Sequence, residues 1–336
     1  MEISNAGDLT YFVSDRTRKL VLLLADYSLY AALFGSIIFF SIVAAEYNFL
    51  TFGNFINILI SAAVLGLITV GLTLAMLAGQ IDLSAGGIAG LASVIVAILF
   101  LWWGWPAPLA VLGVLLVGAL AGLFSSFLII ECKIYSLIAT LAVIGLFTGI
   151  GMTASNNIQI TISNLDLQKF LLYRGIFGIP LTVWFMLLFY VVGYVLLNHT
   201  KLGAHIYATG ANHTAARLAG VPVNWVIRIT LMLSGVSVAL AASMVTARGN
   251  ITILYGAASS NAQLQATDAL IAVLLGGVSL FGGAGRIERN LVAVLFLSVL
   301  ANGLTLMNMP LSGWLMARGF AFLIAVILGV MRYRLM

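Results

Sequence analysis

Six polar residues interrupt long apolar stretches of this sequence, and their side chains are the ones most able to do chemistry. They are Asn57, Asp82, Ser84, Thr140, Asp268 and Asn302. A polar group in apolar surroundings is costly unless it has a hydrogen-bonding partner or a wet cavity. We therefore expect each residue either to line or gate a path for a polar solute, or to hydrogen-bond between helices. The sequence alone does not choose between these roles.

Catalytic patterns are missing from the sequence. It contains no HExxH or GxSxG motif, and none of its lysines follows a glycine and precedes a serine or threonine, as in a Walker A loop. The single cysteine, Cys132, excludes an internal disulfide, and the three histidines within 199–213 lack the spacing of a metal site. We expect no catalytic, cofactor or metal site, and no ATP hydrolysis by this polypeptide.

The composition predicts an all-α, polytopic membrane protein. Of the 336 residues, 62% are hydrophobic and 7% are charged, whereas soluble domains are about 25% charged. A membrane-spanning helix needs about 20 apolar residues. Ten segments are candidate spans, of which the eighth is short and glycine-rich: 27–45, 55–79, 83–103, 107–130, 134–152, 179–197, 226–246, 267–283, 290–308 and 314–331.

The distribution of lysine and arginine predicts the orientation of these spans. With the N-terminus inside, eleven of the fifteen basic residues fall on the inner side and four on the outer side, as the positive-inside rule requires. Both termini are then cytoplasmic, with a cytoplasmic segment at 1–26 and a transmembrane domain at 27–336. This anchoring explains the net charge of +5, which therefore gives no reason to expect nucleic acid as a partner.

Two glycine-rich motifs stand where inward-running spans are expected to end. In the first, at 79–87, Asp82 and Ser84 could cap the following helix. In the second, at 267–286, Asp268 could cap the eighth span from outside. A capped turn between two spans is the simpler interpretation of the first motif, and a helix break beside a substrate path is the functional one.

The inner loop at 198–225 is the longest polar and basic interruption of the sequence. Asn212 is a good N-cap for a short helix over 213–219. The apolar face of this helix would comprise Ala215, Ala216 and Leu218. Because a helix of about two turns is unstable alone, we expect it to pack either on its own membrane domain or in the groove of a partner.

Small residues elsewhere suit close packing between helices in a bilayer. The spacing of Gly118 with Gly122, and of Gly145 with Gly149, predicts two such contact faces.

The motifs together resemble the membrane subunit of bacterial ATP-binding-cassette importers, in the branch of the ribose, xylose, arabinose and galactose permeases. The family's GIDLS-x-G element is matched by 80–86, with Gln80 where glycine is usual. Its HT-x-LG-x-x-IYA element, which continues to RL-x-G, is matched by 199–220, and its DA-to-GRI element by 268–287. The similarity covers roughly 48–330, and several motifs in the right order make it specific.

The resemblance implies a multi-pass protein of the bacterial inner membrane, surrounded by lipid, that imports a neutral monosaccharide or polyol. Two permeases, identical or homologous, would form the path; ATPase subunits would dock below and an extracytoplasmic sugar-binding protein above. ATP would then be bound only by partners. The residues implied to seat in the ATPase groove are Ala211, Asn212, Thr214, Ala215, Ala216, Arg217, Leu218 and Gly220. Replacing Ala216 with Asp is expected to uncouple transport while the protein still inserts.

Two departures from the family pattern leave the partner open. Glu288, Arg289 and Asn290 stand where small residues are common, and His213 replaces a more usual acidic residue. The alternatives are an importer of amino acids or nucleosides, an ion-coupled secondary transporter, and an intramembrane enzyme. Sparse ionisable residues within the spans argue against proton coupling.

Overall fold

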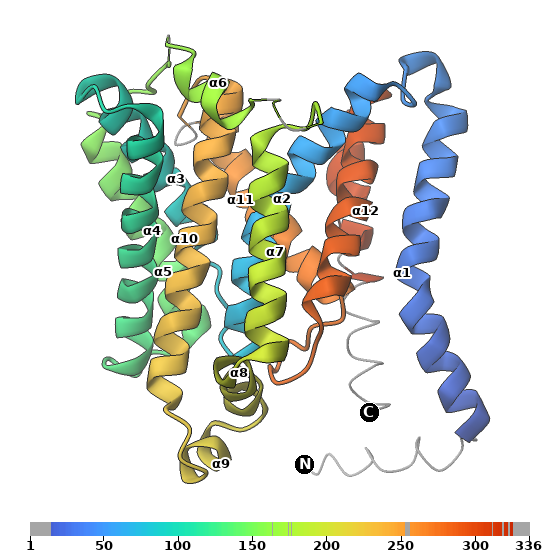
Figure 1. The fold of residues 1–336 in the computed structure, drawn as a ribbon, viewed down its shortest axis with the longest axis vertical. Helices are drawn as coiled ribbons and strands as arrows, with labels where there is room; N and C mark the ends of the chain where they lie inside the picture. The colour runs from blue at the N-terminus through green and yellow to red at the C-terminus, as the bar shows by residue number, and fades with distance from the viewer. Residues whose placement is uncertain are drawn as a thin grey trace.

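The computed structural model describes residues 15–162, 164–173, 175, 177–252, 256–310, 312–317, 319–321 and 323–324, with side chains described from 27 onward except at 256–264. In these ranges the named elements are all helices (Figure 1). An isolated antiparallel bridge joins Thr161 to Ile251. The all-α expectation is confirmed.

The helices follow one another with short connections. They are α1 (Asp15–Val43), α2 (Phe52–Leu77), α3 (Ala85–Ala97), α4 (Ala107–Ile130), α5 (Ser136–Ala154), α6 (Asp166–Leu171), α7 (Leu181–His199), α8 (Lys201–Ala211), α9 (His213–Leu218), α10 (Val223–Gly249), α11 (Gly256–Leu275) and α12 (Ile287–Leu306). A 3-10 turn at Ala45–Tyr47 precedes α2, and a π-helical turn at Ile98–Trp102 extends α3.

Seven helices in the described part of the chain are long and apolar enough to cross a membrane: α2, α3 with its extension, α4, α5, α7, α10 and α12. Each coincides with a predicted span, although the boundaries shift by a few residues. The described apolar part of α1, Tyr27–Val43, is shorter than a full span. The tenth predicted span, 314–331, lies partly outside the described residues.

The eighth predicted span, 267–283, is displaced toward the N-terminus. Helix α11 begins at Gly256 and ends at Leu275, because alanine, leucine and glutamine in its first half favour a helix despite their modest hydropathy. The glycine-rich end of the predicted span is instead a turn, in which Gly277, Gly282 and Gly283 have positive φ. Asp268 therefore lies within the helix and does not cap it.

The core lies between α2, α3 and α10, whose apolar windows are mostly buried, whereas α4, α5 and α7 are largely exposed. Gly122 of α4 allows a close approach to α10, since a Cβ there would lie 2.1 Å from the Leu231 oxygen. Gly118 makes a similar approach to Gly235, so this predicted contact face is confirmed. A Cβ built on Gly145 or Gly149 would have no described atom of another segment within 4 Å, so that predicted face does not pack within this chain.

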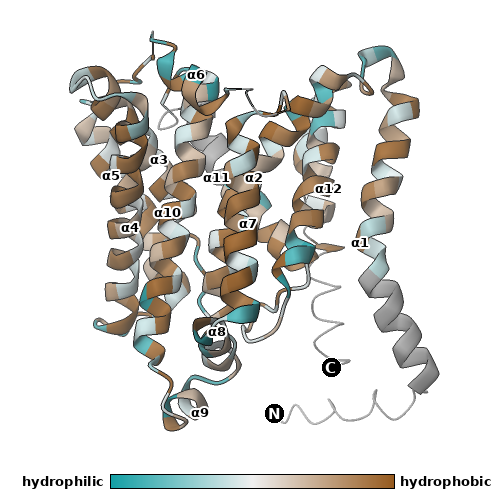
Figure 2. Cartoon of the chain, in the orientation of Figure 1, coloured by the Kyte–Doolittle hydropathy of each residue, from teal (hydrophilic) through white to brown (hydrophobic). Residues whose placement is uncertain are grey.

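The two ends of the bundle differ in structure. Helices α8 and α9 lie at one end and α6 at the other (Figure 1). Figure 2 shows apolar residues along the bundle and polar residues gathered toward its two ends. By the basic-residue distribution the end that carries α8 and α9 is the inner, cytoplasmic one.

Candidate functional site

Both glycine-rich motifs and the inner loop meet at one place. The Gly283 N–H, in the turn after α11, donates to the Leu77 oxygen at the end of α2 at 3.0 Å. A Cβ on Gly210 of α8 would lie 1.9 Å from that same oxygen, and a Cβ on Gly282 would lie 2.7 Å from the Gly79 Cα. We call Leu77, Gly79, Gly210, Gly282 and Gly283 the glycine junction. In the glycine junction, backbone atoms contact backbone atoms. A Cβ at one of these glycine positions would therefore push the segments apart.

Helix α9 begins as the sequence predicts. The Asn212 side chain accepts hydrogen bonds from the Thr214 and Ala215 N–H groups, each at 3.0 Å, which is the expected N-cap. The helix ends at Leu218, and Gly220 follows with a φ of +82°.

The apolar residues of α9 do not share one face, which corrects the expectation for Ala216. Ala216 is 5% exposed and packs in a cluster with Ala75, Ile227 and Leu231 of its own membrane domain. Leu218 is 86% exposed. The helix is therefore seated on its own chain through Ala216, and among its apolar side chains Leu218 points outward.

Two side chains connect the inner helices to the glycine junction. His213 of α9 places Nε2 3.3 Å from the Ala78 oxygen, in the turn after α2. The Tyr207 hydroxyl of α8 donates to the Gly285 oxygen at 3.0 Å. Burial, with a further contribution from the nearby Glu288, raises the pKa of Tyr207. The hydroxyl therefore keeps the proton that it donates.

Asp82 is the centre of a buried hydrogen-bond network. It is 2% exposed, and its Oδ1 accepts bonds from both the N–H and the hydroxyl of Ser84. Its Oδ2 accepts a bond from the Ser234 hydroxyl of α10 at 2.7 Å. Asp82 thus holds Ser84, the residue at the N-cap position of α3, whereas the Ser84 side chain makes no cap bond. The expected side-chain cap of this helix is therefore wrong.

Thr140 lies beside this network. Its hydroxyl is 3.4 Å from the Ile81 oxygen and 2.9 Å from the Ser136 oxygen, and the Ser136 hydroxyl accepts from the Ile81 N–H at 3.4 Å. The first turn of α5 therefore holds the same turn as Asp82. An inner cavity of about 600 Å³ reaches this turn and is also lined by His213 and Arg217 of α9.

The predicted residues near the outer end form a second group. Asn302 of α12 exchanges two hydrogen bonds with Asn54 of α2, at 2.8 and 2.9 Å. Asn57 is exposed, and Asn54 is the buried amide, so a path or gating role for Asn57 stays a prediction. The two residues are three apart on one helix, and hydropathy does not say which face turns inward.

Asp268 and Asn302 line a cavity of about 320 Å³, which we call the outer cavity. Its walls come from α2, α10, α11, α12 and the segment that follows α12. The polar and aromatic side chains that line it are Ser61, Arg248, Gln265, Asp268, Ser298, Asn302, Thr305 and Trp314. Most of them could not be identified from the sequence, because a single polar residue in a helix does not show which cavity it faces.

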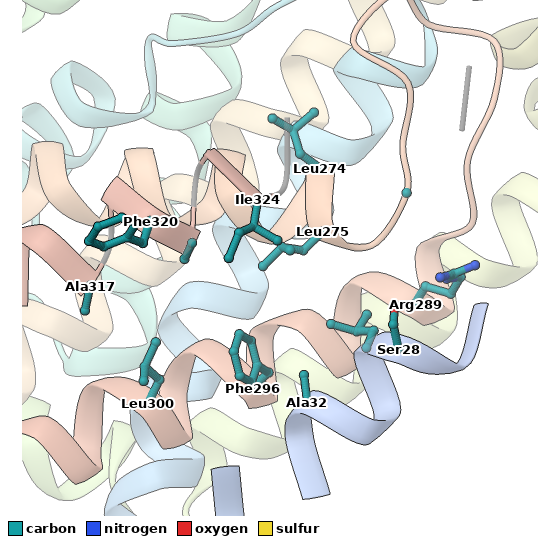
Figure 3. Close-up of a pocket in the computed structure, with 13 residues that line it drawn as sticks. Ser28, Ala32, Leu274, Leu275, Arg289, Phe296, Leu300, Ala317, Phe320 and Ile324 are labelled. Carbon is teal, nitrogen blue, oxygen red and sulfur yellow. The ribbon is translucent and has the colours of Figure 1, made fainter. Parts of the chain in front are cut away.

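A separate cavity of about 390 Å³ lies between α1, α11, α12 and the described residues near 320 (Figure 3). Leucine, phenylalanine and other apolar residues form almost all of its wall, with Ser28 and Arg289 as the exceptions. This cavity contains none of the predicted polar residues and offers few hydrogen bonds to a polar solute, so we do not assign it to the path.

The sequence is similar to known permeases over most of its length. It is 33% identical over 283 residues to the ribose import permease protein of Haemophilus influenzae, covering 83% of this chain and 86% of that protein. The ribose import permease protein of Bacillus subtilis is 36% identical over 278 residues, covering 82% and 84%. The D-allose transport system permease protein of Escherichia coli is 32% identical over 298 residues, covering 88% and 87%. No solved structure matches this chain.

Residues 54–331 match the family described as the permease component of the branched-chain amino acid transport system. This chain has several long apolar helices, and its relatives are permeases of bacterial importers. It is therefore a multi-pass protein of the bacterial inner membrane. The match spans α2 to the last described helix, and it includes the glycine junction, the Asp82 network and the outer cavity. The chain therefore belongs to the permease components of this transport-system family.

Proposed function

We propose that this chain is the membrane-spanning permease of an ATP-binding-cassette importer that brings a neutral monosaccharide or related polyol into the cell. ATP is hydrolysed on separate subunits, and this chain binds no cofactor. A second permease, identical or homologous, completes the path, and an extracytoplasmic binding protein delivers the sugar. The relatives named as ribose and allose permeases support the choice of a sugar over an amino acid.

One structural observation carries the proposal: the inner helices are connected directly to the turns that hold the buried polar groups. Helix α9 contacts the turn after α2 through His213, and α8 contacts both turns through Gly210. That first turn continues into Asp82, which binds α10 through Ser234. A force on α9 from an ATPase subunit would therefore reach the Asp82 network through close contacts, and ATP and the loaded binding protein would each favour a different state.

The proposed coupling surface is the exposed part of the inner loop. It comprises Ala211, Asn212, Thr214, Ala215, Arg217, Leu218 and Gly220, which surround the buried anchor Ala216. Arg217 donates to Asn224 at 3.1 Å on this surface. The exposed Leu218 supplies an apolar side chain that a groove on an ATPase subunit would bury.

The proposal is tested by uptake into proteoliposomes that contain this chain with its candidate permease and ATPase partners. The lumen contains ATP, and the outer solution contains the binding protein with D-ribose, D-xylose, D-allose or L-leucine. We expect one of the sugars to accumulate only when ATP and the binding protein are both present. Accumulation of leucine in place of every sugar would favour the amino-acid importer and contradict the sugar assignment.

A further inference from the structure

We propose that the outer cavity is a low-affinity binding site that receives one neutral monosaccharide from the binding protein before the path opens inward. This inference rests on the proposed function and adds a site to it. It concerns Ser61, Arg248, Gln265, Asp268, Ser298, Asn302, Thr305 and Trp314, which together line the cavity.

The cavity is placed to receive a solute from outside. Arg248 and Thr305, near the outer ends of α10 and α12, are exposed. Ser298, on the same side of α12, is 3% exposed, and the step of seven residues from Ser298 to Thr305 corresponds to about 10 Å of helix. The cavity therefore leads from an exposed mouth to a buried floor in the outer half of the bundle.

The chemistry of the lining suits an uncharged polyol. Arg248 and Asp268 carry opposite charges, so the formal charge of the lining is zero. Its amides and hydroxyls both donate and accept hydrogen bonds, as sugar hydroxyls do. Trp314 adds a flat apolar surface for the C–H face of a sugar ring. A strongly anionic solute would find one cation, Arg248, in a lining that also contains the Asp268 carboxylate.

The size and rigidity of the cavity also suit a small ligand. Its volume of about 320 Å³ is near the lower end of the range of about 300–1,000 Å³ for small-molecule sites. Its walls are fixed in advance, because Asn302 is paired with Asn54 and the Arg248 guanidinium donates to Ser61 at 3.1 Å. Preorganised groups reduce the ordering cost of binding.

The floor of the cavity is closed in this structure. Below it, Asn290 of α12 donates to the Thr73 hydroxyl of α2 at 2.6 Å, and both residues are fully buried. The Asn290 Oδ1 has no hydrogen-bond partner among the described residues. A sugar held in the outer cavity would therefore wait until α2 and α12 separate, and its hydroxyls could then satisfy this acceptor.

The site is tested by protecting a single cysteine from labelling in spheroplasts that express the complete importer. Cys132 is exposed and is first replaced by serine, and Ser61→Cys then reports on the cavity. A membrane-impermeant maleimide is applied with and without D-ribose, D-xylose, D-allose or L-leucine. We expect the transported sugar to slow the labelling of Ser61→Cys about threefold at a concentration of twice its Kd, as mass action requires.

Matched variants separate binding from general effects. Ile158→Cys, which is exposed outside the cavity, should be labelled at the same rate with and without sugar. Asp268→Asn in the Ser61→Cys background should raise the sugar concentration needed for protection about tenfold, equivalent to about 1.4 kcal/mol. Asp166→Asn, an exposed carboxylate paired with Lys169, should leave that concentration unchanged.

The outcomes distinguish the site from the proposed function. Sugar uptake by the importer without protection of Ser61→Cys overturns the site and leaves the function standing. Labelling of Thr305→Cys but not of Ser61→Cys would show that the cavity is closed to the outside, which also overturns the site. Protection by L-leucine in place of any sugar overturns both.

Discussion

At the scale of single residues, Asn54 and Asn302 show how one turn of helix decides the role of a polar side chain. Their reciprocal amide pair joins α2 to α12, while Asn57, one turn further along α2, is exposed. The sequence identifies an amide in an apolar helix but not the direction in which it points, because α2 is apolar on every side and its hydropathy has no clear period.

A double-mutant cycle should measure this pair. Asn54→Leu and Asn302→Leu should each lower the free energy of unfolding, with a coupling energy of about 0.6 kcal/mol and at most about 1.7 kcal/mol. Asn57→Leu is the matched control on the same helix and should change stability by about 0.5 kcal/mol or less. Thermal unfolding in detergent gives these values, and strictly additive single effects would contradict the assigned pair.

The hydrogen-bond partners of Asp82 determine what a substitution at this position would do to stability and transport. Asp82→Asn replaces one carboxylate oxygen with an amide donor, which would face the donors Ser84 or Ser234. We expect a loss of about 1–3 kcal/mol of stability, with reduced uptake, measured by melting temperature and transport in the same preparation. A variant that melts and transports like the original chain would show that the carboxylate network does not hold the turn.

At the scale of helices, the glycine junction explains why three separate motifs contain glycine. The position of two of them, at 79–87 and 267–286, at the ends of inward-running spans was predicted, and so was the short helix capped by Asn212. Their mutual contact was not, because backbone proximity between segments more than 70 residues apart in the sequence leaves no local pattern. The start of α11 was missed for another reason: its first half is helical by propensity but too polar to be counted as a span.

Gly210→Ala should test the junction. The added Cβ would lie 1.9 Å from the Leu77 oxygen, so α8 must move away from α2. We expect loss of uptake and a cost of about 1–3 kcal/mol. Gly145→Ala is the matched control within a helix, since its surroundings are open, and it should be neutral or slightly stabilising. Equal behaviour of the two variants would remove the junction from the coupling route.

Leu218→Asp should test the docking role of α9. Leu218 is 86% exposed, so the change should leave the melting temperature of the isolated permease almost unaltered while it weakens ATPase binding. Ala216→Asp is the contrasting variant, because it buries a carboxylate in the membrane domain and should destabilise the permease itself. Co-purification of the ATPase subunit reports the difference, and full retention by the Leu218 variant would argue against docking at α9.

At the scale of the whole molecule, polar groups are concentrated at two levels of an otherwise apolar bundle. The outer cavity lies near one end, and the Asp82 network with the inner cavity lies near the other. Composition was sufficient to predict seven of the spans, and the N-cap residue Asn212 predicted the inner helix. The orientation stays a prediction from the basic-residue counts. The cavities depend on the way in which α2, α10, α11 and α12 pack together, which no single segment of the sequence encodes.

The central claim is that this permease has no driving force of its own and is moved by ATPase subunits. The most direct measurement is the initial rate of sugar uptake into proteoliposomes under an imposed ion gradient, with ATP in the lumen, the binding protein and sugar outside, and the ATPase subunits either present or omitted. The account predicts accumulation with the ATPase subunits and none without them. Accumulation by the permease alone, driven by the ion gradient, would contradict it.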